Sequence, residues 1–107
     1  MRYWPIVIPV LPANAMALFP FILFKDAKKK EDLTLINHEK IHFYQQLELL
    51  ILPFYLLYFL NYCINVFFYK KHSKAYFNIC FEKEAYANDH NHDYISNRKL
   101  YSWLNYI

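Results

Sequence analysis

The first 24 residues are apolar but are interrupted repeatedly by proline. Each proline removes a backbone amide donor that a helix would need, so the segment 1–24 is predicted to be extended. Its part Ala15–Phe24 is predicted to be an edge strand, because an edge tolerates the missing donor at Pro20. A signal peptide is the alternative, since Ala13-Asn14-Ala15 has the small residues of a cleavage site. The prolines are Pro5, Pro9, Pro12 and Pro20.

Beyond residue 24 the chain has one polar segment and then several segments with helical character. The polar segment, 25–32, is predicted to be a loop, and Asp32 or Thr34 can cap the helix that follows. Pro53 is predicted to end this first helix, since the residue before a proline is disfavoured in helical conformation. The predicted helices span 34–52, 54–70, 74–93 and, in an aromatic tail, 96–107.

The composition indicates one domain with an excess of apolar side chains. The 107 residues are too few for two hydrophobic cores, so 1–107 is expected to be a single domain. Hydrophobic residues make up 57% of the chain and aromatic residues 21%, whereas a soluble domain is roughly 45–50% apolar. Lipid contact or an unusually aromatic core is expected to accommodate this excess.

The lysines are gathered into two clusters, each directly after an apolar stretch, and the formal net charge is +3. This placement suits a membrane interface with anionic lipid. A nucleic-acid groove would need basic residues interleaved with exposed aromatic ones, so no nucleic-acid partner is expected. The clusters are Lys25, Lys28, Lys29 and Lys30, followed by Lys70, Lys71 and Lys74.

The sequence holds no glycine and two widely spaced cysteines, Cys63 and Cys80. Phosphate-binding loops and dinucleotide-binding turns need backbone conformations that only glycine supplies, which excludes kinases, nucleotidases and dehydrogenases. The cysteines lie in apolar surroundings and form neither a paired metal motif nor a redox motif. They are predicted to be buried free thiols.

His38-Glu39-Lys40-Ile41-His42 is an H-E-x-x-H motif inside the first predicted helix. Residues four apart lie on one helical face, so both imidazoles can reach one zinc ion. Glu39 is placed to act as general base on the water that the metal activates, although a glutamate on an exposed helix face is more often simply solvated. We therefore expect Zn²⁺ at His38 and His42, with a third ligand from elsewhere in the chain.

A resemblance indicates that third ligand. Phe81-Glu82-Lys83-Glu84-Ala85 lies on a later predicted helix, and the pairing of H-E-x-x-H with F-E-x-x-A resembles the gluzincin metallopeptidases, particularly the membrane branch of prenyl-protein endopeptidases. The resemblance implies that Glu82 is the ligand. Glu84 points about 200° away from Glu82 on a helix, so only one of the two can bind the metal.

The chain departs from the gluzincin pattern at one position. In the family an E-x-x-A-D motif ends in an aspartate that supports a ligand histidine, whereas this chain has Tyr86 there. Asp89, seven residues after Glu82 and on the same helical face, is the candidate to replace it. The chain also resembles a group of short bacterial membrane proteins that share the stretch Ile36–Gln46. This second resemblance covers most of the chain.

The apolar run Leu47–Phe68 bears on how the chain meets a membrane. Its 22 residues are enough to cross a bilayer, but one crossing would separate the histidines from Glu82 by about 30 Å of hydrocarbon. A break at Pro53 resolves the conflict, because the second helix can then run antiparallel to the first. The third helix runs antiparallel to the second and brings Glu82 to the level of the histidines. We expect an apolar helical hairpin dipping into one leaflet, with a soluble domain as the alternative.

Further polar residues are candidates for supporting roles. Tyr86 and His90, one and two turns beyond Glu82, face the right way to stabilise a tetrahedral oxyanion, while an ordinary structural role is the alternative for any of the 11 tyrosines. His90 and His92 form a second candidate metal site, for which a plain polar helix end is the alternative. The residues that either hydrogen-bond the ligands from behind or face water are Gln45, Gln46 and Glu48.

The sequence thus predicts a mainly α fold with a small N-terminal β element, a compact zincin-like domain whose residues 34–93 form a three-helix zinc-site core. The expected function is zinc-dependent hydrolysis of peptide bonds in a peptide or protein substrate by a membrane-associated bacterial protein. The alternative is a non-catalytic membrane protein in which the same ligands hold a structural zinc or serve assembly with a partner.

Overall fold

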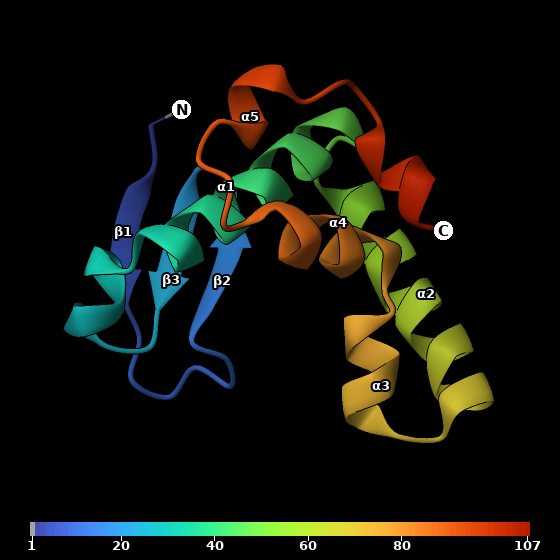
Figure 1. Ribbon diagram of the computed structural model, residues 1–107. Coiled ribbons are helices and arrows are strands. Elements are labelled where there is room, and N and C mark those ends of the chain that lie inside the picture. The colour runs from blue at the N-terminus through green and yellow to red at the C-terminus, as the bar shows by residue number, and fades with distance from the viewer. Residues whose placement is uncertain (1) are drawn as a thin grey trace.

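The computed structural model describes residues 2–107 and is mainly helical, with a small three-stranded sheet near the N-terminus (Figure 1). The predicted fold class is therefore confirmed. The strands are β1 (Trp4–Val7), β2 (Ala15–Leu18) and β3 (Phe21–Phe24). The helices are η1 (Ala27–Glu31), α1 (Leu33–Glu48), α2 (Leu52–Tyr69), α3 (His72–Phe77), α4 (Cys80–Asn88), α5 (Tyr94–Asn97) and η2 (Ser102–Tyr106), η marking 3-10 helices.

β3 lies in the middle of the sheet, paired in parallel with β1 and antiparallel with β2. A single strand over 15–24 was predicted, but the chain reverses at Phe19 and Pro20 and forms a hairpin. Pro20 lacks an amide donor, and the turn places it where no ladder bond is needed. The prediction of one strand was therefore wrong, while β2 does form an edge of the sheet.

α1 lies between the sheet on one side and α4 on the other (Figure 1). Asp32 caps its start by accepting a hydrogen bond from the Leu35 amide, which decides between the two predicted caps. The small side chains of Ala15 and Ala17 let the helix approach β2 closely. The buried cluster at this contact comprises Ala15, Ala17, Ile22, Phe24, Ile36 and Phe43.

The break between α1 and α2 comes before Pro53. α1 ends at Glu48, and Leu50 and Ile51 follow with φ near 61°, a value that residues of a right-handed helix do not adopt. Pro53 instead lies in the first turn of α2, where the amide that it lacks has no helical partner. The prediction that Pro53 itself ends the first helix was wrong, but the predicted pair of helices is present.

The predicted third helix over 74–93 is divided into α3 and α4. Ile79 between them has extended backbone (φ −63°, ψ 130°) and is completely buried in a cluster with Phe54 and Phe81. Burying Ile79 therefore interrupts the helix, and α3 returns alongside α2 before α4 crosses back to α1 (Figure 1). Of the two free cysteines, Cys80 is buried as predicted, whereas Cys63 is exposed on α2.

The C-terminal segment does not form the single helix predicted for 96–107. α5 begins at Tyr94, two residues before Ser96, and η2 packs against α4. Trp103 lies against Phe81 with ring centroids 5.0 Å apart. The aromatic tail thus packs against the core around α4.

α2 is long and apolar enough to cross a membrane by length and composition, with 18 residues of which only 11% are buried. Core helices of soluble proteins pass the same test of length and composition. Its face toward the protein carries Phe54 and Asn65, which are buried. The apolar side chains with the highest exposed fraction on its other faces are those of Leu52, Leu56, Phe59, Leu60, Phe67 and Phe68.

Candidate metal centre

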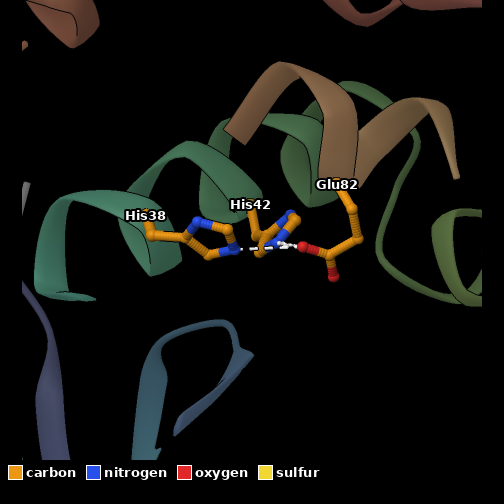
Figure 2. A group of neighbouring side chains, drawn as sticks. All are labelled: His38, His42 and Glu82. Atoms are coloured by element: carbon orange, nitrogen blue, oxygen red, sulfur yellow. Dashed lines mark hydrogen bonds and ion pairs between the residues drawn. The ribbon is translucent and has the colours of Figure 1, made fainter. Parts of the chain in front are cut away.

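Three buried side chains from α1 and α4 converge on one point (Figure 2). The Nε2 atoms of His38 and His42 lie 3.0 and 3.1 Å from the same oxygen, Oε1 of Glu82. The three donor atoms all lie within 4.8 Å of one another. Since donors that share a tetrahedral zinc ion are about 3.3 Å apart, this group has the right spacing to hold one metal ion.

Both imidazoles are fixed from behind by hydrogen-bond acceptors. Nδ1 of His38 lies 3.0 Å from Oδ2 of Asp89, and Nδ1 of His42 lies 2.7 Å from Oε1 of Gln45. An acceptor at Nδ1 keeps the ring proton there and leaves the Nε2 lone pair free for a metal. Asp89 thus lies against His38, as its position seven residues after Glu82 predicted, and Gln45 lies against His42.

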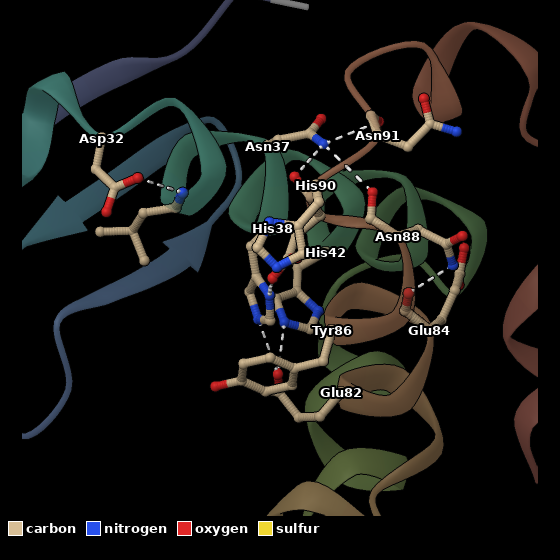
Figure 3. A network of polar contacts seen from close by, with 12 residues as sticks. Asp32, Asn37, His38, His42, Glu82, Glu84, Tyr86, Asn88, His90 and Asn91 are labelled. Carbon is tan, nitrogen blue, oxygen red and sulfur yellow. Dashed lines mark hydrogen bonds and ion pairs between the residues drawn. The ribbon is translucent and has the colours of Figure 1, made fainter.

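Asn37, the residue before the motif, holds the end of α4 in place (Figure 3). Its side-chain amide donates to the backbone carbonyls of Asp89 at 2.8 Å and Asn91 at 3.2 Å. α1 thereby fixes the position of the Asp89 carboxylate that supports His38.

The donor set fits a divalent cation. With their protons on Nδ1, both rings direct a lone pair at a carboxylate oxygen, and this arrangement is repulsive unless a proton or a metal ion lies between. Burial alone would lower the pKa of His42, but the negative charge of Glu82 outweighs it and raises that pKa to about 9. Burial would raise the pKa of Glu82, but His42 and His38 lower it. Protons and a metal therefore compete for this site.

Tyr58, on α2, donates a hydrogen bond to the second oxygen of Glu82, with Oη and Oε2 2.5 Å apart. This contact fixes the carboxylate so that Oε1 faces the imidazoles. The sequence did not indicate Tyr58, because its helix was predicted to belong to an apolar hairpin in the membrane. Nothing in its spacing distinguishes Tyr58 from the other tyrosines.

A cleft beside the histidines separates β2 from α3 and α4. It consists of two adjoining cavities of about 490 and 330 Å³. His38 lines the first, His42 and Glu82 line the second, and Glu39 lines both. Glu39 is only 5% exposed, and burial raises the pKa of its carboxyl. The alternative of a solvated Glu39 on an open helix face is therefore wrong.

The two predicted oxyanion donors lie in different surroundings. Tyr86 lines the first cavity, its ring centroid lies 4.4 Å from that of His38, and its hydroxyl lies 3.2 Å from the Tyr76 hydroxyl. The His90 side chain is 85% exposed, faces the Asp89 carboxylate at 3.5 Å, and does not line either cavity. Tyr76, which sequence analysis did not single out, lines both cavities.

The remaining candidates have structural surroundings. Glu84 lies away from the histidines, in an ion pair with Arg98. Gln46 donates to the Ala17 carbonyl and accepts from the Phe19 amide, so it attaches α1 to the β2–β3 turn. Within residues 2–107, the group of His38, His42 and Glu82 is the one set of three potential ligands close enough to share an ion, and His92 takes no part in it.

Comparisons with protein-family models, curated proteins and solved structures find no match to this chain. The metal centre therefore rests on the geometry of the chain itself.

Proposed function

We propose that this protein is a zinc-dependent peptidase of the gluzincin type that works at a membrane surface. The observation that carries the proposal is the convergence of two imidazole Nε2 atoms and a carboxylate oxygen, beside a cleft that Glu39 also lines. When bound, zinc supplies the Lewis acidity that polarises a peptide carbonyl and activates water. Glu39 takes the proton of the attacking water and passes it to the leaving amine.

Glu39 is well suited to this role. Its burial raises the pKa of the carboxyl above its usual value, and a general base works best when its pKa lies near the working pH. Tyr86 and Tyr76 bring hydroxyl groups to the cleft as donors for the developing oxyanion. His90, outside the cleft, has no part in the proposed chemistry.

The free edge of β2 offers a place for an extended substrate. The Ala17 carbonyl accepts hydrogen bonds from Gln46 and Tyr55, so the peptide group of Ala17 faces away from β3. Because backbone groups alternate along a strand, those of Ala15 face the same way, and Ala15 lines the cleft. A peptide paired there lies along the row of Glu39 and the ligand histidines.

The position of α2 supports a membrane surface as the working site. Its outer face is apolar, and Lys70, Lys71 and Lys74 follow its end, an arrangement that favours anionic lipid. The antiparallel α3 packs against α2 and carries the exposed His72, Ser73 and Lys74. A full crossing by α2 would carry α3 and α4, which pack against it, into the hydrocarbon together with the charged residues of α4. We therefore propose that α2 lies in the interface with its outer face in lipid.

The first test is metal analysis of the purified protein. We expect one zinc per chain in the wild type and loss of zinc in the variants His38→Ala and Glu82→Gln, because each removes a ligand. Absence of a bound metal in the wild type at neutral pH would contradict the proposal.

The second test separates a peptidase from a structural zinc protein. Glu39→Gln keeps the three ligands, so we expect full zinc content and a loss of about 10²- to 10⁴-fold in kcat on a mixture of fluorogenic peptides. A wild type that holds zinc but cleaves none of these peptides, with Glu39→Gln indistinguishable from it, would favour the structural alternative.

A further inference from the structure

Glu84 is a fully buried carboxylate that the proposed chemistry does not use. It lies on the opposite side of α4 from Glu82 and is 0% exposed. Arg98 donates to both of its oxygens and Tyr94 donates to one of them. A second buried carboxylate, Glu48, completes the pairing by accepting from Arg98 at 2.7 and 3.1 Å.

Glu84 reaches the metal centre through one side chain, Gln45. The Gln45 amide nitrogen donates to Oε1 of Glu84 at 2.9 Å and to the Phe81 carbonyl at 3.0 Å. Its oxygen is thereby left to face Nδ1 of His42 at 2.7 Å. If the Gln45 amide were flipped, its oxygen would face the Glu84 carboxylate and the Phe81 carbonyl, and its NH₂ group would face the N–H of His42. Both contacts would be repulsive, so the observed orientation is favoured.

We propose that Glu84 is a positioning residue for the metal centre, which fixes through Gln45 the nitrogen of His42 that faces the metal. The proposal rests on the proposed zinc site. As an ionised carboxylate Glu84 can only accept, so it allows one orientation of the Gln45 amide. That orientation holds the His42 proton on Nδ1 and directs the Nε2 lone pair to the ion. Arg98 keeps Glu84 ionised by facing it with a buried positive charge.

The decisive variant is Glu84→Gln, whose amide can donate as well as accept and so no longer fixes the orientation of Gln45. We expect zinc affinity, measured by competition with a chromophoric chelator, to fall about 10- to 100-fold. The matched control is Glu48→Gln, which weakens the same Arg98 pairing without touching Gln45. Its zinc affinity should stay within about threefold of the wild type, even if its melting temperature falls as much as that of Glu84→Gln.

A double-mutant cycle tests the route through Gln45. Gln45→Met removes the amide, so adding Glu84→Gln to it should cause no further loss of zinc affinity. Equal losses in Glu84→Gln and Glu48→Gln, or independent losses from Gln45→Met and Glu84→Gln, would overturn the inference.

A measurement on the wild type covers the case in which Glu84→Gln fails to fold. In ¹⁵N NMR spectra of the zinc-loaded protein, we expect a protonated Nδ1 on His42. A proton on Nε2, or a wild type that binds no zinc, would contradict the inference. A wild type that binds zinc with this tautomer but cleaves no peptide would overturn only the peptidase, since every measurement here reads metal binding rather than turnover.

Discussion

At the scale of single residues, the proposed zinc ion would compete with a proton for the same nitrogen of His42. In the metal-free protein the neighbouring Glu82 outweighs the effect of burial and raises the pKa of His42 from 6.5 to about 9. The ring therefore carries a proton at neutral pH that a metal must displace. Metal affinity and metal-free stability should consequently depend on pH in opposite directions.

We predict that zinc affinity rises about tenfold per pH unit from pH 7 to about 9 and then levels off. The metal-free protein should change the other way. A raised folded-state pKa contributes stability that is complete below pH 6.5 and is lost as the pH rises through about 9. Chelator competition and thermal melts across this range check both trends. A zinc affinity independent of pH would show that His42 is not protonated in the metal-free site.

Residues of the site were predictable where helical spacing decides their position. His38 and His42 lie four apart and Glu82 and Asp89 seven apart, so each pair shares a helical face, and the structure joins the two faces. The support from Tyr58 was not predictable, because it depends on how α2 packs against α4. Tertiary packing of this kind leaves no periodic signal in the sequence.

At the scale of elements, the chain makes left-handed helix ends without glycine. Four non-glycine residues in the described chain have positive φ, and one of them, Lys70, follows directly after α2 with φ 58°. The left-handed conformation costs a residue with a Cβ about 1–2 kcal/mol, a cost that glycine does not bear. The other three are Leu50, Ile51 and Tyr101.

We predict that Lys70→Gly stabilises the protein by about 0.5–1 kcal/mol, because glycine relieves this cost at the helix end. Lys71→Gly is the matched control, since Lys71 has extended backbone with φ −131° and loses the same charge. It should leave the stability within about 0.5 kcal/mol of the wild type, because the added freedom of the unfolded chain opposes the preference of a helix N-cap for glycine. Urea unfolding of both variants measures the difference, and an equal gain in stability in both would contradict the explanation.

The elements themselves were predicted more accurately than their ends. The helix that carries the motif and the apolar helix after it follow from local patterns. The segment 25–32 was predicted to be a loop, and this was wrong in part, because the 3-10 helix η1 lies within it, capped by the Asp26 side chain. The interruption at Ile79 does not follow from local patterns, because burial of this side chain against Phe54 and Phe81 overrides a continuous helical pattern. The turn at Pro20 was missed for a related reason: a proline tolerated at an edge and a proline in a turn look alike in sequence.

At the scale of the whole molecule, α2 presents two different faces. Phe54 and Tyr58 on the inner face contact the metal centre, while Leu56 and Phe67 on the outer face are 69% and 76% exposed. The sheet lies on the other side of the molecule (Figure 1). The exposed apolar face and the candidate metal centre are therefore joined by one helix.

We predict that replacing Leu56 and Phe67 by serine lowers binding to vesicles containing anionic phospholipid by about tenfold or more, because each buried side chain contributes about 1.5–3 kcal/mol. Zinc content should be unchanged. The control is Val10→Ser, at a residue 89% exposed between β1 and β2, which should leave vesicle binding unaltered. Sedimentation with vesicles measures both, and equal effects of the two changes would locate the lipid contact elsewhere.

The thickness of α2 sets a limit on the substrates that the proposed membrane-surface peptidase can reach. An α-helix with its side chains is about 10–12 Å across, and α2 is the element between the outer apolar face and Tyr58 at Glu82. An extended chain advances about 3.3 Å per residue, so that thickness equals roughly three residues. In the proposed peptidase, α2 would therefore set the distance between the membrane and the site. Peptide bonds a few residues above the headgroups would come within reach, and those deep in the bilayer or far out in solution would not.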